Sequence, residues 1–165
     1  MRFDKREFTK ILEENKGIIH KVSLLYADNP EDRADLFQEI CFQLWRSYGS
    51  YREDARFSTW MYRVAINTAI SQIRKRKKDI SKEEYYSQNH TSYTTDTYEE
   101  RDQKEKLFRA ISKLNKIDKA IIMLWLEEKK YEEIAEIMGI SKSNVSVKLV
   151  RIKLSLAEKL KGSEK

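Results

Sequence analysis

Residues 131–141 read YEEIAEIMGIS, and residues 142–159 continue as KSNVSVKLVRIKLSLAEK. The first eight of these residues predict a short helix, after which Gly139 favours a tight turn. Ser141 is a suitable N-cap for a second, basic helix that extends to about Lys159. A short helix, a turn containing glycine and a capped basic helix are together typical of a helix-turn-helix.

The second of these helices has two faces that differ in chemistry. At about 100° per residue, one side carries apolar residues that are expected to face a core: Val145, Leu149, Ile152, Leu156 and Leu160. The opposite side carries candidate DNA-binding residues: Lys142, Ser143, Asn144, Val147, Lys148 and Arg151. Serine and asparagine can reach base edges, valine can contact a thymine methyl, and the cations can bind guanine or phosphate. Lys148 and the flanking Lys153 are expected mainly to bind phosphate. A plain solvated face is the alternative, which the exposed apolar positions Val147, Val150 and Leu154 disfavour.

The composition supports helices throughout the chain. The 165 residues include one proline and four glycines, while 36% of them are charged and 40% are apolar. Such a chain has too few turn formers for an all-β sandwich and is typical of an all-α fold. Ahead of the helix-turn-helix, one helix is expected over residues 103–114. A central buried helix is expected over residues 117–126, which are apolar on nearly all sides.

Residues 79–102 divide the chain into two small helical domains, residues 1–78 and 103–161. Residues 85–96 contain hydroxyl groups, amides and tyrosines but no aliphatic side chain, which predicts an irregular linker. The linker is acidic, with a net charge of −5, whereas residues 1–78 and 103–165 carry +5 and +6. Two basic domains favour a polyanionic partner bound at two places, and ordinary solvated helix faces are the alternative.

Three or four helices are expected in the first domain, and three of them can be placed, over residues 5–26, 31–47 and 58–78. Pro30 suits the first turn of the second helix, and Ser58 or Thr59 suits the N-cap of the third. The second helix is expected to bury one apolar stripe: Leu36, Phe37, Ile40, Cys41, Leu44 and Trp45. Its other side carries polar residues around an apolar anchor: Asp35, Gln38, Glu39, Phe42 and Arg46. This pattern is typical of a protein interface, and packing of Phe42 within its own domain is the alternative.

The third helix presents a different chemistry on its exposed side. Its apolar stripe is expected to comprise Met61, Tyr62, Ala65, Ile66, Ala69 and Ile73. The opposite side and the basic end of the helix carry candidate nucleic-acid-binding residues: Trp60, Arg63, Asn67, Ser71, Arg74 and Lys75. An aromatic ring can stack on a base, an amide can read a base edge, and cations can hold phosphates. Core packing of Trp60 is the alternative.

Several functional classes lack their usual signals in this sequence. A single cysteine, Cys41, excludes an internal disulfide and a cysteine-based metal site. The sequence has no glycine-rich phosphate loop, zinc motif or nucleophile elbow, so neither an enzyme nor a metal or other cofactor is expected. No apolar run is long enough to span a membrane, and the charged N-terminus is unlike a signal peptide. A cytoplasmic protein without direct membrane insertion is therefore expected.

Two blocks of sequence resemble those of extracytoplasmic-function sigma factors of bacterial RNA polymerase. Residues 35–45 (DLFQEICFQLW), residues 57–67 (FSTWMYRVAIN) and the basic residues 73–78 resemble region two of that family. Residues 131–141 and 145–156 resemble region four. The two blocks occur in the right order and cover nearly the whole chain apart from the linker. Together they predict a factor that directs core polymerase to specific promoters and initiates transcription.

The resemblance assigns a role to each of the three faces. It implies that Asp35, Gln38, Glu39 and Phe42 bind the core polymerase. It also implies that the helix of residues 60–75, with the loop before it, recognises and opens the minus-ten promoter element. The last helix would read the minus-thirty-five element, and an anti-sigma factor would be a further partner. A free-standing helix-turn-helix regulator with an N-terminal dimerisation domain is the alternative.

Three positions differ from the residues common in that family. The family commonly has Asp at the position of Ser71, Pro at that of Asn115 and a basic residue at that of Ser146. Ser71 and Ser146 lie on or beside the predicted DNA-binding faces, so the family's promoter preference is not carried over. Asn115 is expected to weaken the start signal of the helix that follows it.

Overall fold

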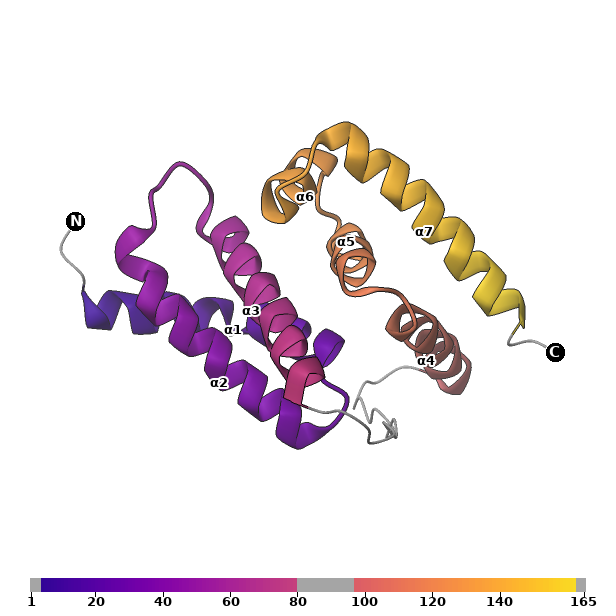
Figure 1. Cartoon of the computed structure of the whole chain (residues 1–165), viewed down its shortest axis with the longest axis horizontal. Coiled ribbons are helices and arrows are strands. Elements are labelled where there is room, and N and C mark those ends of the chain that lie inside the picture. Colours follow the sequence, from indigo (N-terminus) through magenta and orange to yellow (C-terminus); the bar gives the residue numbers. More distant parts are fainter. Residues whose placement is uncertain (1–3, 80–96, 163–165) are drawn as a thin grey trace. The chain divides into compact units, whose positions relative to one another are not determined.

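The computed structural model describes residues 4–79 and 97–162, and within these ranges its regular structure is entirely helical (Figure 1). The elements are α1 (Lys5–Tyr26), α2 (Pro30–Ser47), the 3-10 turn η1 (Tyr48–Ser50), α3 (Phe57–Asp79), α4 (Tyr98–Ser112), α5 (Lys116–Leu126), α6 (Tyr131–Met138) and α7 (Lys142–Gly162). The chain forms two compact units, Met1–His90 and Thr91–Lys165. The predicted all-α fold of two helical domains is confirmed.

The first unit is a bundle in which α1, α2 and α3 each pack against the other two (Figure 1). Its core consists of apolar side chains that are almost completely buried: Ile19, Val22, Ile40, Leu44, Met61, Ala65 and Ile66. The helix starts are capped by side chains, since Asp4 accepts a hydrogen bond from the Arg6 amide and Asn29 accepts one from the Asp32 amide. Burying one stripe of each helix leaves the opposite stripe of α2 and α3 at the surface.

The second unit contains α4–α7, and α7 packs against each of the other three helices (Figure 1). Its most deeply buried residues come from the three later helices and are all at most 3% exposed: Ala120, Ile121, Ile122, Leu124, Ile134, Ile137, Val145, Leu149 and Ile152. The buried Ala110 and Ile111 of α4 complete this core. The predicted apolar stripe of the last helix is buried as far as Leu156, while Leu160 is half-buried. The polar face of α7 therefore points away from the core.

Two predicted boundaries and one predicted start signal are wrong. The predicted linker extends to residue 102, but α4 begins at Tyr98 because Thr97 and Glu100 form a reciprocal capping box. The remaining linker residues 80–96 lie outside the described residues. The third helix begins at Phe57, so Ser58 and Thr59 lie in its first turn instead of capping it. Asn115 does not weaken its helix: its side chain accepts hydrogen bonds from the Ile117 and Asp118 amides and caps α5.

Two large apolar side chains are more exposed than their positions in the helical pattern predict. Trp45 is 37% exposed and meets Phe8 edge-to-face near the C-terminal end of α2. Leu126 is 46% exposed and is the last residue of α5. The predicted central helix over 117–126 is thus buried along most of its length but not at its end.

Candidate nucleic-acid and polymerase interfaces

The turn between α6 and α7 fixes where the last helix begins. Gly139 adopts the left-handed conformation (φ 68°, ψ 34°), which an L-residue with a side chain adopts only with strain. The Ile140 amide donates to the Ala135 carbonyl at 3.1 Å, and the Ser141 hydroxyl oxygen accepts from the Asn144 amide at 3.1 Å. The predicted short helix, tight turn and serine cap are therefore present, and they define a helix-turn-helix.

The face of α7 opposite its buried stripe carries the predicted DNA-contacting residues together. Five of them are exposed and one, Lys148, is half-buried: Lys142, Ser143, Asn144, Val147, Lys148 and Arg151. Val147, Val150 and Leu154 are 50%, 58% and 63% exposed, as the helical pattern predicts. The face combines hydrogen-bonding groups near the N-terminus with cations and methyl groups further along, which suits a helix lying in the major groove.

Two of the lysines on or beside this face already have partners within the unit. Lys142 forms an ion pair with Glu132 of α6. The Lys153 ammonium lies 4.0 Å from the centre of the Trp125 ring, in a cation–π contact. The sequence predicts that Lys153 contacts phosphate, but in the structure its ammonium group lies over the Trp125 ring of α5. Neither partner is visible in a helical-wheel projection, because both lie on other helices.

The exposed side of α3 carries five of the six residues predicted for the minus-ten element. Arg63, Asn67, Ser71, Arg74 and Lys75 are all exposed and lie opposite a buried stripe. They span about three turns of helix, so one continuous polar face about 18 Å long is available for a nucleic-acid strand. Arg76, in contrast, is tied to α2 by an ion pair with Asp32 at 3.0 Å.

Trp60, the sixth of these residues, is half-buried in a group of aromatic rings. Its ring centre lies 5.2 Å from that of Tyr51, 5.3 Å from that of Phe57 and 6.4 Å from that of Tyr48. The Tyr51 hydroxyl donates to the Ala55 carbonyl at 2.8 Å. Trp60 therefore packs against aromatic rings of η1, of the loop that precedes α3 and of the first turn of α3, without entering the buried core. Only the exposed part of its ring can contact a nucleic acid.

The exposed side of α2 carries the residues predicted to bind polymerase. Phe42 is 56% exposed, which contradicts the alternative that it packs within its own domain. Asp35 and Gln38 are exposed beside it, and Glu39 is half-buried and accepts a hydrogen bond from the Gln43 amide at 2.9 Å. An apolar ring surrounded by polar groups is the usual centre of a protein–protein contact.

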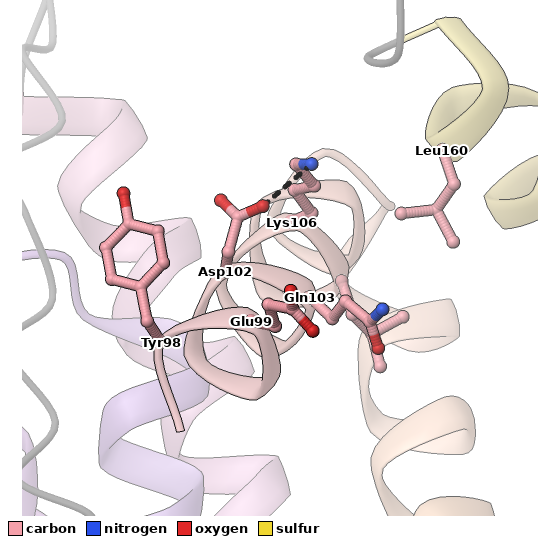
Figure 2. A pocket seen from close by; sticks show the side chains of 7 residues that line it. Tyr98, Glu99, Asp102, Gln103, Lys106 and Leu160 are labelled. Carbon is pink, nitrogen blue, oxygen red and sulfur yellow. Dashed lines mark ion pairs between the residues drawn. The ribbon is translucent and has the colours of Figure 1, made fainter. Parts of the chain in front are cut away.

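One open hollow of about 500 Å³ lies within the second unit, between the start of α4 and the end of α7 (Figure 2). Its lining comprises Tyr98, Glu99, Asp102, Gln103, Lys106, Leu107 and Leu160. Lys106 forms an ion pair with Asp102 at 2.8 Å, the dashed contact in Figure 2. None of the lining residues is a Ser, Cys or His nucleophile. Among the described parts of the chain, no group of three or more His, Cys, Asp or Glu residues is placed to hold a metal ion.

Comparison with known proteins agrees with this arrangement. Residues 11–79 match sigma-70 region 2, and residues 104–156 match sigma-70 region 4. The chain is 33% identical over 140 residues to the RNA polymerase sigma factor YlaC of Bacillus subtilis, covering 81% of this chain and 80% of YlaC. It is 29% identical over 157 residues to the sigma factor SigV of the same organism, covering 89% and 90%. The fold is similar to that of the sigma factor RpoE in its complex with the anti-sigma factor NepR from Bartonella quintana (TM-score 0.76, 18% identity, covering 94% of this chain and 98% of RpoE).

The chain belongs to the sigma-70 family of RNA polymerase sigma factors. Within that family it is a sigma factor of the extracytoplasmic-function class, as are relatives such as SigW of Bacillus subtilis, to which it is 25% identical over 170 residues. The match of both regions disfavours a free-standing regulator with an N-terminal dimerisation domain. None of the described helices has the length and apolar character needed to span a bilayer.

Proposed function

We propose that this sigma factor divides promoter recognition among the three exposed helix faces. In this proposal the α2 face binds core polymerase, the α3 face binds and opens the minus-ten element, and the α7 face reads the minus-thirty-five element. The corresponding functional domains are the helices α1–α3 and the helices α4–α7, the latter beginning at Tyr98 instead of residue 103. The observation that supports it best is that each face lies opposite a buried stripe and combines the chemistry that its partner requires.

Strand opening in this scheme requires no catalysis by the chain. Binding an unstacked strand on the α3 face would offset the free energy of separating the base pairs, because cations and an amide contact groups that the duplex conceals. We therefore infer that the chain is not an enzyme and uses no cofactor. It would act in the cytoplasm, where bacterial RNA polymerase transcribes the genome.

An anti-sigma factor is proposed as a further partner. The structures of RpoE and of CnrH, the latter at a TM-score of 0.69, are of sigma factors in complex with NepR and with the cytosolic domain of CnrY. The exposed Phe42 on α2 and the exposed Val150 and Leu154 on α7 are apolar positions that a protein partner would cover.

Reconstituted transcription tests the proposed function directly. Purified core polymerase is mixed with a library of genomic promoter fragments, with and without the full chain, and the transcripts are sequenced. We expect a defined subset of start sites to appear only with the chain, without hydrolysis of ATP before the first bond forms. Identical transcripts from both reactions would contradict the proposal.

Replacing Phe42 by alanine is expected to weaken binding to core polymerase by about 1–3 kcal/mol, as loss of an interface anchor does. The fold should remain intact, because a ring that is 56% exposed contributes little to the core. Titration of labelled chain with core polymerase measures the affinity. Leu24→Ala is the matched control, since Leu24 is an exposed apolar residue on α1. Equal affinities of wild type and Phe42→Ala would remove α2 from the polymerase interface.

Replacing Arg151 by alanine is expected to cost about 1–3 kcal/mol at one base position and to relax the preference there. Substituting Lys148 by alanine should instead weaken binding to all sequences alike and lower the salt slope by about one. Selection from DNA randomised over the upstream element, with the reconstituted holoenzyme, separates the two effects. If wild type and Arg151→Ala select the same consensus, Arg151 reads no base.

A further inference from the structure

The three acidic residues of α6 have three different roles. The Glu133 carboxylate accepts a hydrogen bond from the Lys130 amide at 3.1 Å and so belongs to the helix cap. Glu132 forms an ion pair with Lys142, the first residue of α7. Glu136 is exposed and, within the described residues, pairs with no cation. The sequence predicts that these acids form one solvated cluster, whereas in the structure Glu132 forms an ion pair with α7.

The Glu132–Lys142 pair bridges the two helices of the helix-turn-helix at its exposed surface. The two charged atoms are 2.5 Å apart, and both side chains are 62% exposed. The hydrogen bond from Lys142 is the main cause that lowers the pKa of the Glu132 carboxyl, followed by a backbone hydrogen bond and the charge of Lys142. Glu132 is therefore ionised at neutral pH and holds a cation that α7 would otherwise present to DNA.

The position of the pair at the start of α7 matters for phosphate binding. The N-terminus of a helix carries a partial positive charge, which disfavours a cation such as Lys142 and attracts an anion. Glu132 supplies at this point the negative charge that a DNA phosphate would supply. A phosphate that approaches Lys142 therefore competes with Glu132 for the ammonium group and is repelled by its carboxylate.

We propose that Glu132 competes with DNA phosphates for Lys142 and thereby lowers the affinity of α7 for the DNA backbone of any sequence. This inference rests on the proposed contact of α7 with promoter DNA. It makes Glu132 a positioning residue that acts through Lys142 and contacts no base. Its effect is to limit sequence-independent binding. The base contacts of Ser143, Asn144 and Arg151 then account for a larger share of the free energy with which α7 binds promoter DNA.

The test measures binding of the full chain to a 20-base-pair duplex of arbitrary sequence by fluorescence anisotropy over a salt series. We expect Glu132→Gln to bind about three- to fivefold more tightly than wild type, because Lys142 is freed for one phosphate contact. The slope of log affinity against log salt should become steeper by up to about one. The free energy of unfolding of Glu132→Gln should differ little from that of wild type, since exposed ion pairs contribute little to stability.

Glu136→Gln is the matched control for charge. It removes one negative charge one helical turn from Glu132, on the same face of α6, but releases no lysine. The affinity of this variant for the duplex should therefore stay close to that of wild type. In the background Lys142→Gln, the substitution Glu132→Gln should no longer increase affinity, which a double-mutant cycle measures directly.

Two outcomes would overturn the inference while leaving the proposed function in place. One is an equal gain in affinity from Glu132→Gln and Glu136→Gln, which would show only a general effect of charge. The other is a gain from Glu132→Gln that persists without Lys142. If wild type binds no duplex even at the lowest salt, the proposed DNA contact of α7 fails, and the inference fails with it.

Discussion

Replacing Asn67 and Arg74 together by alanine is expected to reduce promoter opening by the reconstituted polymerase at least about 30-fold. Each contact to a base edge or phosphate is worth about 1–3 kcal/mol, and each 1.4 kcal/mol is a factor of about ten. The two residues lie about 10 Å apart along α3, so their effects should be nearly additive. Both side chains are exposed, so the fold of the first unit should not change.

Permanganate footprinting of unpaired thymines measures the opening step itself. Lys10→Ala combined with Lys16→Ala is the control, because it removes two exposed cations from α1 without touching the α3 face. We expect normal footprints from this control and a loss of reactive thymines from the α3 variant. A full footprint from Asn67→Ala, Arg74→Ala would show that α3 does not bind the opened strand.

The existence of each helix could be predicted from the sequence because local signals agree with the hydrophobic period. The first helix is predicted over residues 5–26 and observed as α1 (Lys5–Tyr26), since its apolar spacing ends just before the Asn29–Pro30 break. The exposed face of α7 could also be predicted, because Val145, Leu149 and Ile152 recur on one side of the helix and are buried. The hydrophobic period alone predicts which side chains are buried when the rest of the domain packs against only one side of the helix.

Trp60 shows where that reasoning fails. Helical-wheel arithmetic places it opposite the core stripe, but it cannot show that the loop before α3 folds back over the same side. Tyr51 in that loop supplies the cover, and Phe57 in the first turn of α3 adds to it, with ring centres 5.2 and 5.3 Å from the centre of Trp60. The signal available in the sequence is the recurrence of aromatic residues at 48, 51, 57 and 60, which predicts a ring cluster only once the turn η1 brings them together.

Side-chain pairs that form across a turn are, like the surroundings of Trp60, a feature that the hydrophobic period does not predict. Glu132 and Lys142 are ten positions apart, and their meeting depends on the left-handed backbone of Gly139 and on two flexible side chains. The start of α4, in contrast, has a readable signal: Thr97 and Glu100 have the spacing of a capping box. The prediction misses this signal because it continues the polar linker of residues 85–96 through residue 102.

Replacing Leu149 by alanine is expected to lower the free energy of unfolding of the second unit by about 2–5 kcal/mol. Leu149 is 1% exposed and lies on α7, the helix that packs against α4, α5 and α6. A domain of this size has a stability of only about 5 kcal/mol, so the loss would unfold a substantial fraction of it. Val150→Ala is the matched control: Val150 is the next residue, it is 58% exposed, and its truncation should change stability by less than about 0.5 kcal/mol.

Hydrogen exchange of the full chain, followed peptide by peptide, separates the two units. We expect Leu149→Ala to increase exchange throughout α4–α7, because all four helices share one core, and to leave protection of α1–α3 unchanged. Binding to an upstream promoter element should fall with the folded fraction, while binding to core polymerase through the α2 face should persist. Equal loss of protection in both units would mean that they unfold as one, and the second unit would then not be an independent reader of DNA.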